Sequence, residues 1–251
     1  MLIAQISDTH ILAPGAPERA AESRTENLRR CVADINWQGV DIVLHTGDSV
    51  QNGVAEEYAF LRDILSDLEA PLYIVPGNRD RAAALRETLD HLGYLPGEGE
   101  FLHYAVEDYP LRLIGMDTTC AGERKGFFCA ERRGWLEETL SAEPEKPTLL
   151  FFHHPPFDVP SEGYIDGYRN PAERETLTAV VSRHPQVVQI LCGHVHSQNR
   201  RDWGGTVVTT MPSVAVDVRK GVDTAIGEAP LYMLHRFEPG AGVDTGTRVA
   251  A

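Results

Sequence analysis

Side chains that can bind metals follow several apolar segments of this chain. They are Asp8 with His10, Asp48, Asn78 with Arg79 and Asp80, His153 with His154, and His194 with His196. Carboxylate oxygens and imidazole nitrogens are ligands for divalent and transition metals. Two cations about 3.5–4 Å apart can activate a water and stabilise the attacking and leaving oxygens of a displacement. The pattern therefore predicts a hydrolytic site with two metals.

The spacing of these residues fits such a cluster. Residues at alternate positions of an extended segment point to the same side, so Asp8 can act with His10, and His194 with His196. Asp48 has two carboxylate oxygens and can bridge two cations, whereas a neutral asparagine such as Asn78 supplies an oxygen without adding charge. We therefore expect the side chains of these segments to converge on one place.

Each piece taken alone has an ordinary explanation. Pro76-Gly77 followed by Asn78 is common turn chemistry, and Asp80 can cap a helix that begins at Arg81. A single buried histidine is also common in protein cores. The prediction of a site rests on the whole set, because each of these polar segments follows the end of an apolar one.

Alternating strands and helices would position these residues. Apolar runs predict strands at 2–6, 40–44, 71–75, 101–106, 111–116, 149–152, 187–192, 206–211 and 231–237. We expect the strands at 101–106 and 111–116 to be antiparallel neighbours. Helical spacing predicts helices at 19–36, 58–68, 81–92, 130–140 and 171–184. This order is typical of sheets covered by helices, in which sites collect beyond the carboxyl ends of strands.

Composition limits the classes of function. The 251 residues include 23 basic and 37 acidic side chains, a net charge of −14, which argues against stable binding to nucleic acid or to an anionic membrane. No apolar run is long enough to span a membrane, and the sequence MLIAQISDTH lacks the features of a signal peptide. The four cysteines show no CxxC spacing, so we expect reduced thiols and a cytoplasmic protein. We expect one domain over 1–238 and a flexible tail over 239–251.

The order Asp-x-His, Gly-Asp, Gly-Asn, His-x-Pro and Gly-His-x-His resembles the calcineurin-like metallophosphoesterase superfamily. The stretches HHPPF and ILCGHVHSQ are most similar to bacterial class III cyclic-nucleotide phosphodiesterases and glycerophosphodiesterases. The resemblance implies an α/β fold in which two mixed β-sheets pack as a sandwich flanked by helices. It also implies two metal ions drawn from iron, manganese, zinc and cobalt.

The resemblance also implies roles for individual residues. The ligands of the first metal would be Asp8, His10, Asp48 and His196, and those of the second Asp48, Asn78, His153 and His194. His153 is preferred to His154 because the family's ligand stands two residues before a proline, here Pro155. His154 would lie behind the ligands or, with His194 and Arg79, contact the substrate.

Arg79 departs from the family pattern, which usually has a histidine after Gly-Asn. A guanidinium stays charged and cannot serve as a general acid near neutral pH, but it can bind a phosphate and stabilise charge in the transition state. We expect Asp48, Asn78 and Arg79 to be the catalytic residues, with Asp80 capping the following helix and orienting the loop.

The expected activity is hydrolysis of a small phosphodiester, a cyclic nucleotide or a glycerophosphodiester, by attack of a metal-bridging hydroxide. A phosphomonoesterase, a phosphonate ester hydrolase, a nucleotide-sugar pyrophosphatase and a catalytically silent metal- or phosphate-binding module stay open as alternatives. We expect the substrate to be the main partner, and the oligomeric state stays open. The pocket walls are expected from residues 157–170 and 211–217.

Overall fold

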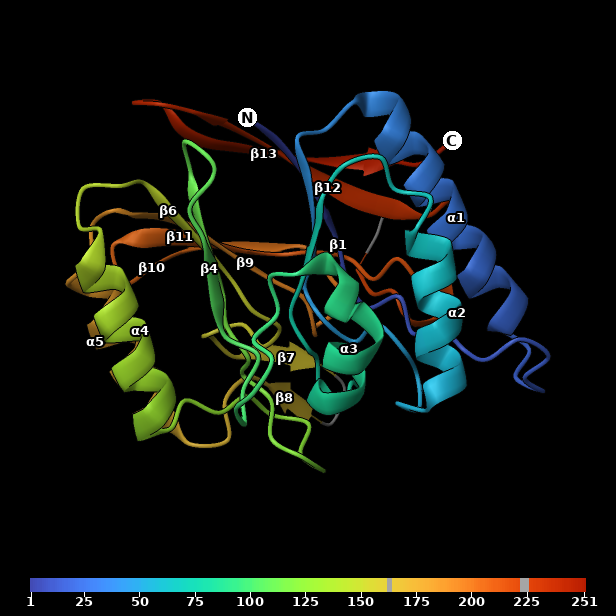
Figure 1. Cartoon of the computed structure of the whole chain (residues 1–251), viewed down its shortest axis with the longest axis horizontal. Coiled ribbons are helices and arrows are strands. Elements are labelled where there is room, and N and C mark those ends of the chain that lie inside the picture. Colours follow the sequence, from blue (N-terminus) through green and yellow to red (C-terminus); the bar gives the residue numbers. More distant parts are fainter. Residues whose placement is uncertain (162–163, 222–225) are drawn as a thin grey trace.

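The computed structural model describes residues 1–161, 164–221 and 226–251 of the chain. Its strands form two larger sheets that pack face to face, and helices cover their outer faces (Figure 1). This arrangement confirms the predicted α/β sandwich of two mixed sheets.

The first sheet has the strand order β13-β12-β1-β2-β3. Its members are β1 (Leu2–Ile6), β2 (Ile42–His45), β3 (Leu72–Ile74), β12 (Leu231–Glu238) and β13 (Gly242–Val249). β1, β2 and β3 run parallel, whereas β12 is antiparallel to β1 and β13 is antiparallel to β12. The three parallel strands therefore end at one edge of the sheet, where the segments that follow them can meet.

The second sheet has the order β10-β11-β9-β6-β5-β4. Its members are β4 (Tyr104–Val106), β5 (Arg112–Gly115), β6 (Thr148–Phe151), β9 (Val187–Cys192), β10 (Asn199–Trp203) and β11 (Thr206–Thr210). The four inner strands run parallel, and the edge strands β4 and β10 are antiparallel to their neighbours. The antiparallel pairing of β4 with β5 confirms the prediction for residues 101–116.

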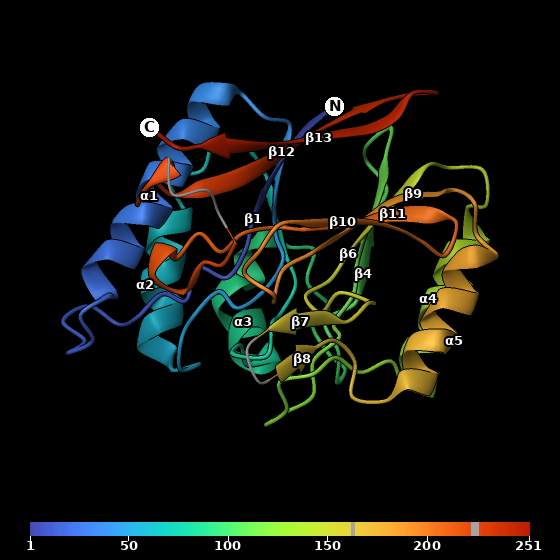
Figure 2. The ribbon, with the colours of Figure 1, turned by 180° about the vertical axis from the view of Figure 1, so that it is seen from behind.

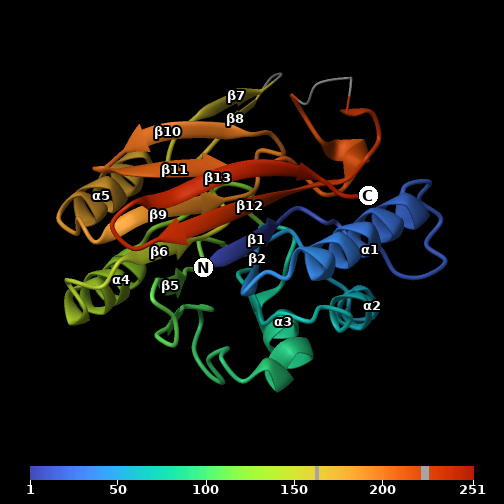
Figure 3. The same ribbon diagram turned by 90° about the horizontal axis from the view of Figure 1, so that it is seen from above.

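The helices divide between the two sheets. α1 (Ala21–Gln38), α2 (Ala55–Leu65) and α3 (Ala82–Leu89) pack with the first sheet, and α4 (Ala130–Ala142) and α5 (Pro171–Ser182) with the second. Figures 2 and 3 show the two groups of helices on opposite sides of the molecule. Short 3-10 turns, η1 (Asp90–Leu92) and η2 (Val216–Val218), lie in the connections.

Strand β6 shows why the inner strands read as continuous apolar runs. Leu149 and Phe151 pack in the core between the sheets, whereas Leu150 and the following Phe152 pack against α4 and α5. Successive side chains of a strand point to opposite faces, so a strand buried on both faces has no polar positions to alternate with apolar ones.

The prediction of a flexible tail over 239–251 is wrong, because Gly242–Val249 form β13 and pair with β12 along its length. An edge strand gains its backbone partners whatever its side chains are, and the residues of β13 are exposed or half-buried, so no apolar pattern is imposed on them. β10 is exposed in the same way, so its sequence has no apolar pattern that would predict a strand. The sequence pattern likewise does not predict the two-stranded sheet of β7 (Val159–Ser161) and β8 (Tyr164–Asp166).

The four cysteines are free thiols, as the sequence predicts. Among the described residues, no helix combines the length and the apolar character needed to cross a membrane.

Candidate metal centre

The ends of strands from both sheets bring the first group of predicted ligands together. Asp8 and His10 follow β1, Asp48 follows β2, and His196 follows β9 of the opposite sheet. One ligand atom from each of these residues lies within 4.8 Å of the others. Nε2 of His196 is 3.2 Å from both Oδ1 of Asp8 and Nε2 of His10. This is the set that the family resemblance implies for the first metal.

A second group adjoins the first through Asp48. Nε2 of His153 lies 3.2 Å from Nδ1 of His194, 3.3 Å from Oδ1 of Asn78 and 3.5 Å from Oδ1 of Asp48. The other oxygen of Asp48, Oδ2, lies 3.9 Å from Nε2 of His10 in the first group. The two oxygens of one carboxylate thus face two different groups of donor atoms, which is the arrangement a bridging ligand needs.

The backbone is strained at the candidate ligands. The non-glycine residues with positive φ in the described part of the chain are Asp8 (52°), His10 (47°), Asp48 (50°), His194 (72°) and His196 (57°). This left-handed region is uncommon for residues with a side chain, and such strain collects at functional sites. Asp8 and His10, and likewise His194 and His196, therefore do not lie in extended chain, which corrects the conformation expected from the sequence.

Glycines allow the polar segments to approach one another. A Cβ atom at Gly47 would lie 2.7 Å from Nδ1 of His153, and one at Gly193 would lie 2.7 Å from Oδ2 of Asp8. A Cβ at Gly77 would come closer than 3.0 Å to the backbone and Oδ1 of Asp48. Real Cβ atoms do not make such contacts, so these three positions require glycine if the ligands are to keep their places.

Two histidines are held in the tautomer that can bind a metal. Nδ1 of His153 donates a hydrogen bond to the carbonyl of Thr46 (2.8 Å), and Nδ1 of His196 donates to the carbonyl of Val218 (3.0 Å). A carbonyl oxygen only accepts, so in the neutral form of each ring the proton sits on Nδ1 and Nε2 is left with the lone pair that could bind a cation. The sequence carries no signal for these partners, because they are backbone atoms.

His154 lies behind the cluster and not in a substrate position. Its side chain is fully buried, its Nδ1 lies 2.8 Å from Oγ1 of Thr118, and its Nε2 donates to the carbonyl of Arg124 (3.1 Å). His154 is near enough to His153 and His194 to form a group of donors, but both of its ring nitrogens are already engaged. The structure therefore corrects the expectation that His154 contacts substrate.

The charge states of the group suit bound cations. Burial lowers the pKa of His10 to about 3 and also holds the pKa of His194 well below its usual range, so both imidazoles are neutral, the form that binds metals. Burial raises the pKa of Asp48 despite the nearby His153. Burial also works against ionised Asp8, but the interactions of Asp8 with His196, His153 and His10 together outweigh it and lower the pKa of Asp8. Cations at this site would offset the cost of the two buried carboxylates.

Asp80 joins two ligand-bearing loops and does not cap α3. Its carboxylate accepts hydrogen bonds from Oγ of Ser49 (2.5 Å), from the backbone N–H groups of Ser49 and Val50, and from that of Gly77 (2.8 Å). The residue at the N-cap position of α3 is Arg81, and it makes no capping bond through its side chain. The predicted cap is therefore wrong, because these donors compete for the same oxygens, while the predicted orientation of the loop is confirmed.

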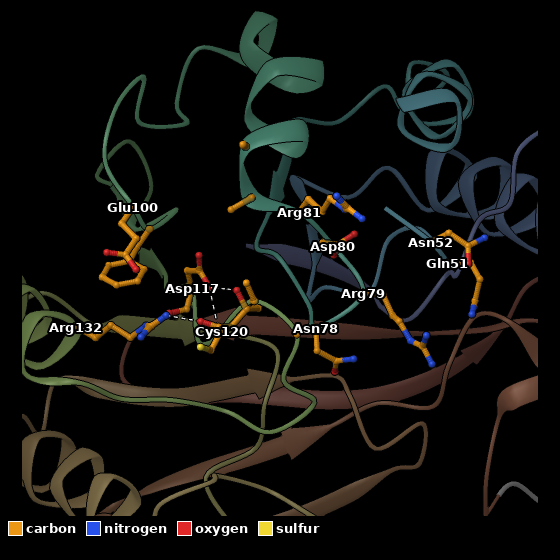
Figure 4. Close-up of a pocket in the computed structure, with 16 residues that line it drawn as sticks. Gln51, Asn52, Asn78, Arg79, Asp80, Arg81, Glu100, Asp117, Cys120 and Arg132 are labelled. Atoms are coloured by element: carbon orange, nitrogen blue, oxygen red, sulfur yellow. Dashed lines mark hydrogen bonds between the residues drawn. The ribbon is translucent and has the colours of Figure 1, made fainter. Parts of the chain in front are cut away.

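A cleft of about 840 Å³ opens beside the second group of donors. It is lined by Gln51, Asn52, Asn78, Arg79, Asp80, Arg81, Ala82, Ala83, Glu100, Phe101, Asp117, Thr119, Cys120, Ala121, Gly122 and Arg132. Figure 4 shows Asn78 and Arg79 pointing to the same side of the cleft. The described residues that line it include none from 157–170 or 211–217, so the predicted walls are wrong for this cleft; residues 162 and 163 lie outside the described residues.

Arg79 is exposed and attached directly to the site through its backbone. Its N–H donates a 2.7 Å hydrogen bond to Oδ1 of Asp48, the oxygen that faces the second group. Within the described part of the chain, its guanidinium has no hydrogen bond or ion pair, whereas that of Arg132 in the same cleft binds the carbonyls of Asp117 and Thr119. Arg79 can therefore meet a ligand without losing an existing partner.

Residues 1–198 match the family of calcineurin-like phosphoesterases, and the chain belongs to that family. An Arcobacter nitrofigilis protein named "Probable glycerophosphodiester phosphodiesterase GpdQ" is 34% identical over 254 residues, covering 98% of this chain and 92% of that protein. The 3',5'-cyclic adenosine monophosphate phosphodiesterase CpdA of Escherichia coli K12 is 28% identical over 221 residues, covering 86% and 77%. The chain is thus an enzyme of a hydrolase family.

The fold is also similar to that of a dimetal phosphatase from Danio rerio, with a TM-score of 0.72. The superposition covers 100% of this chain and 99% of that one, at 13% sequence identity. This likeness concerns the fold alone. Divalent metal ions are the cofactors that the family implies, and the clustered carboxylates, neutral imidazoles and strained backbone fit them.

Proposed function

We propose that the protein is a phosphodiesterase with two metal ions, which hydrolyses a small phosphodiester such as a cyclic nucleotide or a glycerophosphodiester. The observation that carries the proposal is the orientation of the Asp48 carboxylate. Its Oδ2 faces His10, and its Oδ1 faces His153. Relatives named for both kinds of diester support the substrate class. Asp8, His10, Asp48 and His196 would hold one ion, and Asp48, Asn78, His153 and His194 the other.

Two bound cations would supply a nucleophile of lowered pKa and Lewis-acid stabilisation of the phosphate oxygens. The protein's own residues position the substrate and balance its charge. Arg79 would bind a non-bridging phosphate oxygen through its free guanidinium, because its backbone is already fixed to Asp48. Asp80 would hold Gly77 and Ser49, and so the loops on both sides of Asp48, in the same relative position throughout the reaction.

Arg79 also limits how the leaving group can be protonated. A guanidinium does not release a proton near neutral pH, so this residue cannot serve as the general acid that a histidine could be at the same position. We propose that it acts only as a phosphate-binding and charge-stabilising group. Esters with good leaving groups would then be the fastest substrates.

A substrate screen of the Mn²⁺-loaded protein tests the proposal. Bis-p-nitrophenyl phosphate, cyclic nucleotides and glycerophosphodiesters should be hydrolysed, and p-nitrophenyl phosphate should be slower than its diester. The Asp48→Asn variant, assayed in parallel, controls for contaminating esterases. A monoester turned over faster than every diester would show that the protein is a phosphatase, and no turnover of any ester would favour a binding module.

A further inference from the structure

Arg24 of α1 lies outside the candidate metal centre but reaches its first group of donors. Its side chain is almost fully buried, and its guanidinium donates four hydrogen bonds. Its Nη1 donates to the carbonyl of His10 (3.1 Å) and to Oε1 of Gln51 (2.9 Å). Arg24 therefore holds the backbone of one candidate ligand directly.

The same guanidinium holds a second candidate ligand through η2. Nε and Nη2 of Arg24 donate to Oδ1 (2.9 Å) and Oδ2 (2.6 Å) of Asp217, a two-bond pair with the geometry in which arginine binds carboxylates best. Asp217 lies in η2, and the last residue of that turn, Val218, presents the carbonyl that accepts from Nδ1 of His196. Figures 2 and 3 both show the orange segment around residue 216 next to α1.

Arg24 thus connects the two histidines of the first group and makes no described contact with Asn78, His153 or His194 of the second. We propose that the Arg24–Asp217 pair is a positioning device for the first metal site alone. It fixes the His10 segment and the tautomer and direction of His196 without touching the ion. The inference rests on the proposed function, because it assumes that the two groups of donors hold separate ions.

Groups that orient ligands from behind are worth about 10- to 100-fold in metal affinity. The Arg24→Met variant keeps an unbranched side chain that replaces the apolar stem of the arginine but loses every one of these hydrogen bonds. Mn²⁺ binding should be titrated in two backgrounds: Asn78→Ala, which disables the second site, and His10→Ala, which disables the first. We expect Arg24→Met to weaken Mn²⁺ binding at least about 10-fold in the Asn78→Ala background and to leave it unchanged in the His10→Ala background.

Arg112→Met is the matched control. Arg112 is also buried, pairs with the carboxylate of Glu107 (2.5 Å) and donates to the carbonyl of Thr139 (2.6 Å), but it contacts no candidate ligand. Its loss should lower thermal stability and leave Mn²⁺ affinity unchanged in both backgrounds. Asp217→Asn provides a milder second variant, because Asp217 is partly exposed and its loss leaves the bond from Arg24 to His10 in place.

The results separate the proposal from simpler explanations. Equal weakening of Mn²⁺ binding in both backgrounds, or in the Arg112→Met control, would show a general loss of stability and overturn the proposal. Unchanged affinity in the Asn78→Ala background for both Arg24→Met and Asp217→Asn would overturn it as well. Failure of the unmodified protein to bind Mn²⁺ would reject the metal centre itself, and with it the proposed function.

Discussion

Oδ1 of Asp8 lies 3.2 Å from Nε2 of His196, although the two residues follow strands of opposite sheets. Both have positive φ, 52° at Asp8 and 57° at His196, so neither is in a relaxed backbone conformation. The centre therefore lies where the two sheets meet, and its geometry depends on the packing of the whole sandwich. Changes in the backbone of these segments should affect metal binding as strongly as changes in the ligands.

The Gly77→Ala variant tests this dependence on the backbone. The added Cβ would come closer than 3.0 Å to Asp48, so Asp48 or the loop must move. We expect a loss of about 1–3 kcal/mol in the free energy of unfolding, as for other overpacked sites, and weaker Mn²⁺ binding. Denaturant unfolding and Mn²⁺ titration measure the two effects.

Gly134→Ala is the control for this substitution. Gly134 lies within α4, and a Cβ there would meet no atom within 4 Å, so the change should stabilise the protein by about 0.5–1 kcal/mol and leave Mn²⁺ binding unaltered. If Gly77→Ala bound Mn²⁺ as tightly as the unmodified protein, the close approach of the two loops would have no role in the centre.

Asp48→Asn should remove the charge that both ions share. We expect Mn²⁺ content to fall from two equivalents to one or fewer and diesterase activity to be lost, with the fold retained because the amide oxygen can still accept from the N–H of Arg79. Elemental analysis after dialysis measures the metal, and the exposed Asp90→Asn variant controls for the change in net charge. Two retained equivalents would contradict the bridging role.

Arg79→Ala should lower phosphodiester turnover about 10- to 1000-fold, the scale seen when a group that stabilises transition-state charge is removed. Metal content should not change, because only the backbone of Arg79 touches Asp48. Arg62→Ala, on the exposed surface of α2, controls for the loss of one positive charge. Unchanged turnover of every diester would show that Arg79 does not bind phosphate.

The Arg79→His variant separates phosphate binding from proton donation. A histidine can release a proton near neutral pH, whereas a guanidinium cannot. If the position only binds phosphate, the histidine should give no advantage on any substrate. A rate increase confined to esters with poor leaving groups would indicate that the position can donate a proton and would contradict the role we propose.

The burial of His235, which lies away from the metal centre, should make the free energy of unfolding depend on pH. It is fully buried between the sheets, with Nε2 3.1 Å from Oε1 of Gln5 and Nδ1 2.9 Å from Oγ1 of Thr245. Burial lowers its pKa from 6.5 to about 3, so the unfolded chain binds a proton that the folded chain does not. This contribution to stability is full above pH 6.5 and is lost as the pH falls towards 3.

The His235→Gln variant should therefore flatten the acid side of the stability profile. Between pH 6 and 4, the free energy of unfolding of the metal-free protein should fall less steeply in the variant, by about 1.4 kcal/mol per pH unit for one proton. Denaturant unfolding at several pH values measures the slopes, and exposed His91→Gln is the control. Identical slopes in the variant and the unmodified protein would contradict the assignment.

The sequence predicts the inner strands and the ligand set because both depend on side-chain type. Strands such as β9 are buried on both faces and read as apolar runs, and the metal-binding side chains stand directly after them. It does not predict β10 or β13, whose exposed positions impose no apolar pattern. It also misses Arg24 and the carbonyl of Val218, because their roles depend on tertiary contacts and on the backbone. The sequence wrongly predicts that Asp80 caps α3, because a turn and a helix start share the same sequence pattern.

The most direct test of the metal centre is a crystal structure of the Mn²⁺-loaded protein with anomalous scattering measured at the manganese edge. We predict two anomalous peaks about 3.5–4 Å apart, one beside each carboxylate oxygen of Asp48. His10 and His196 should contact one peak, and His153 and His194 the other. A single peak, or two peaks that do not share Asp48, would contradict the account.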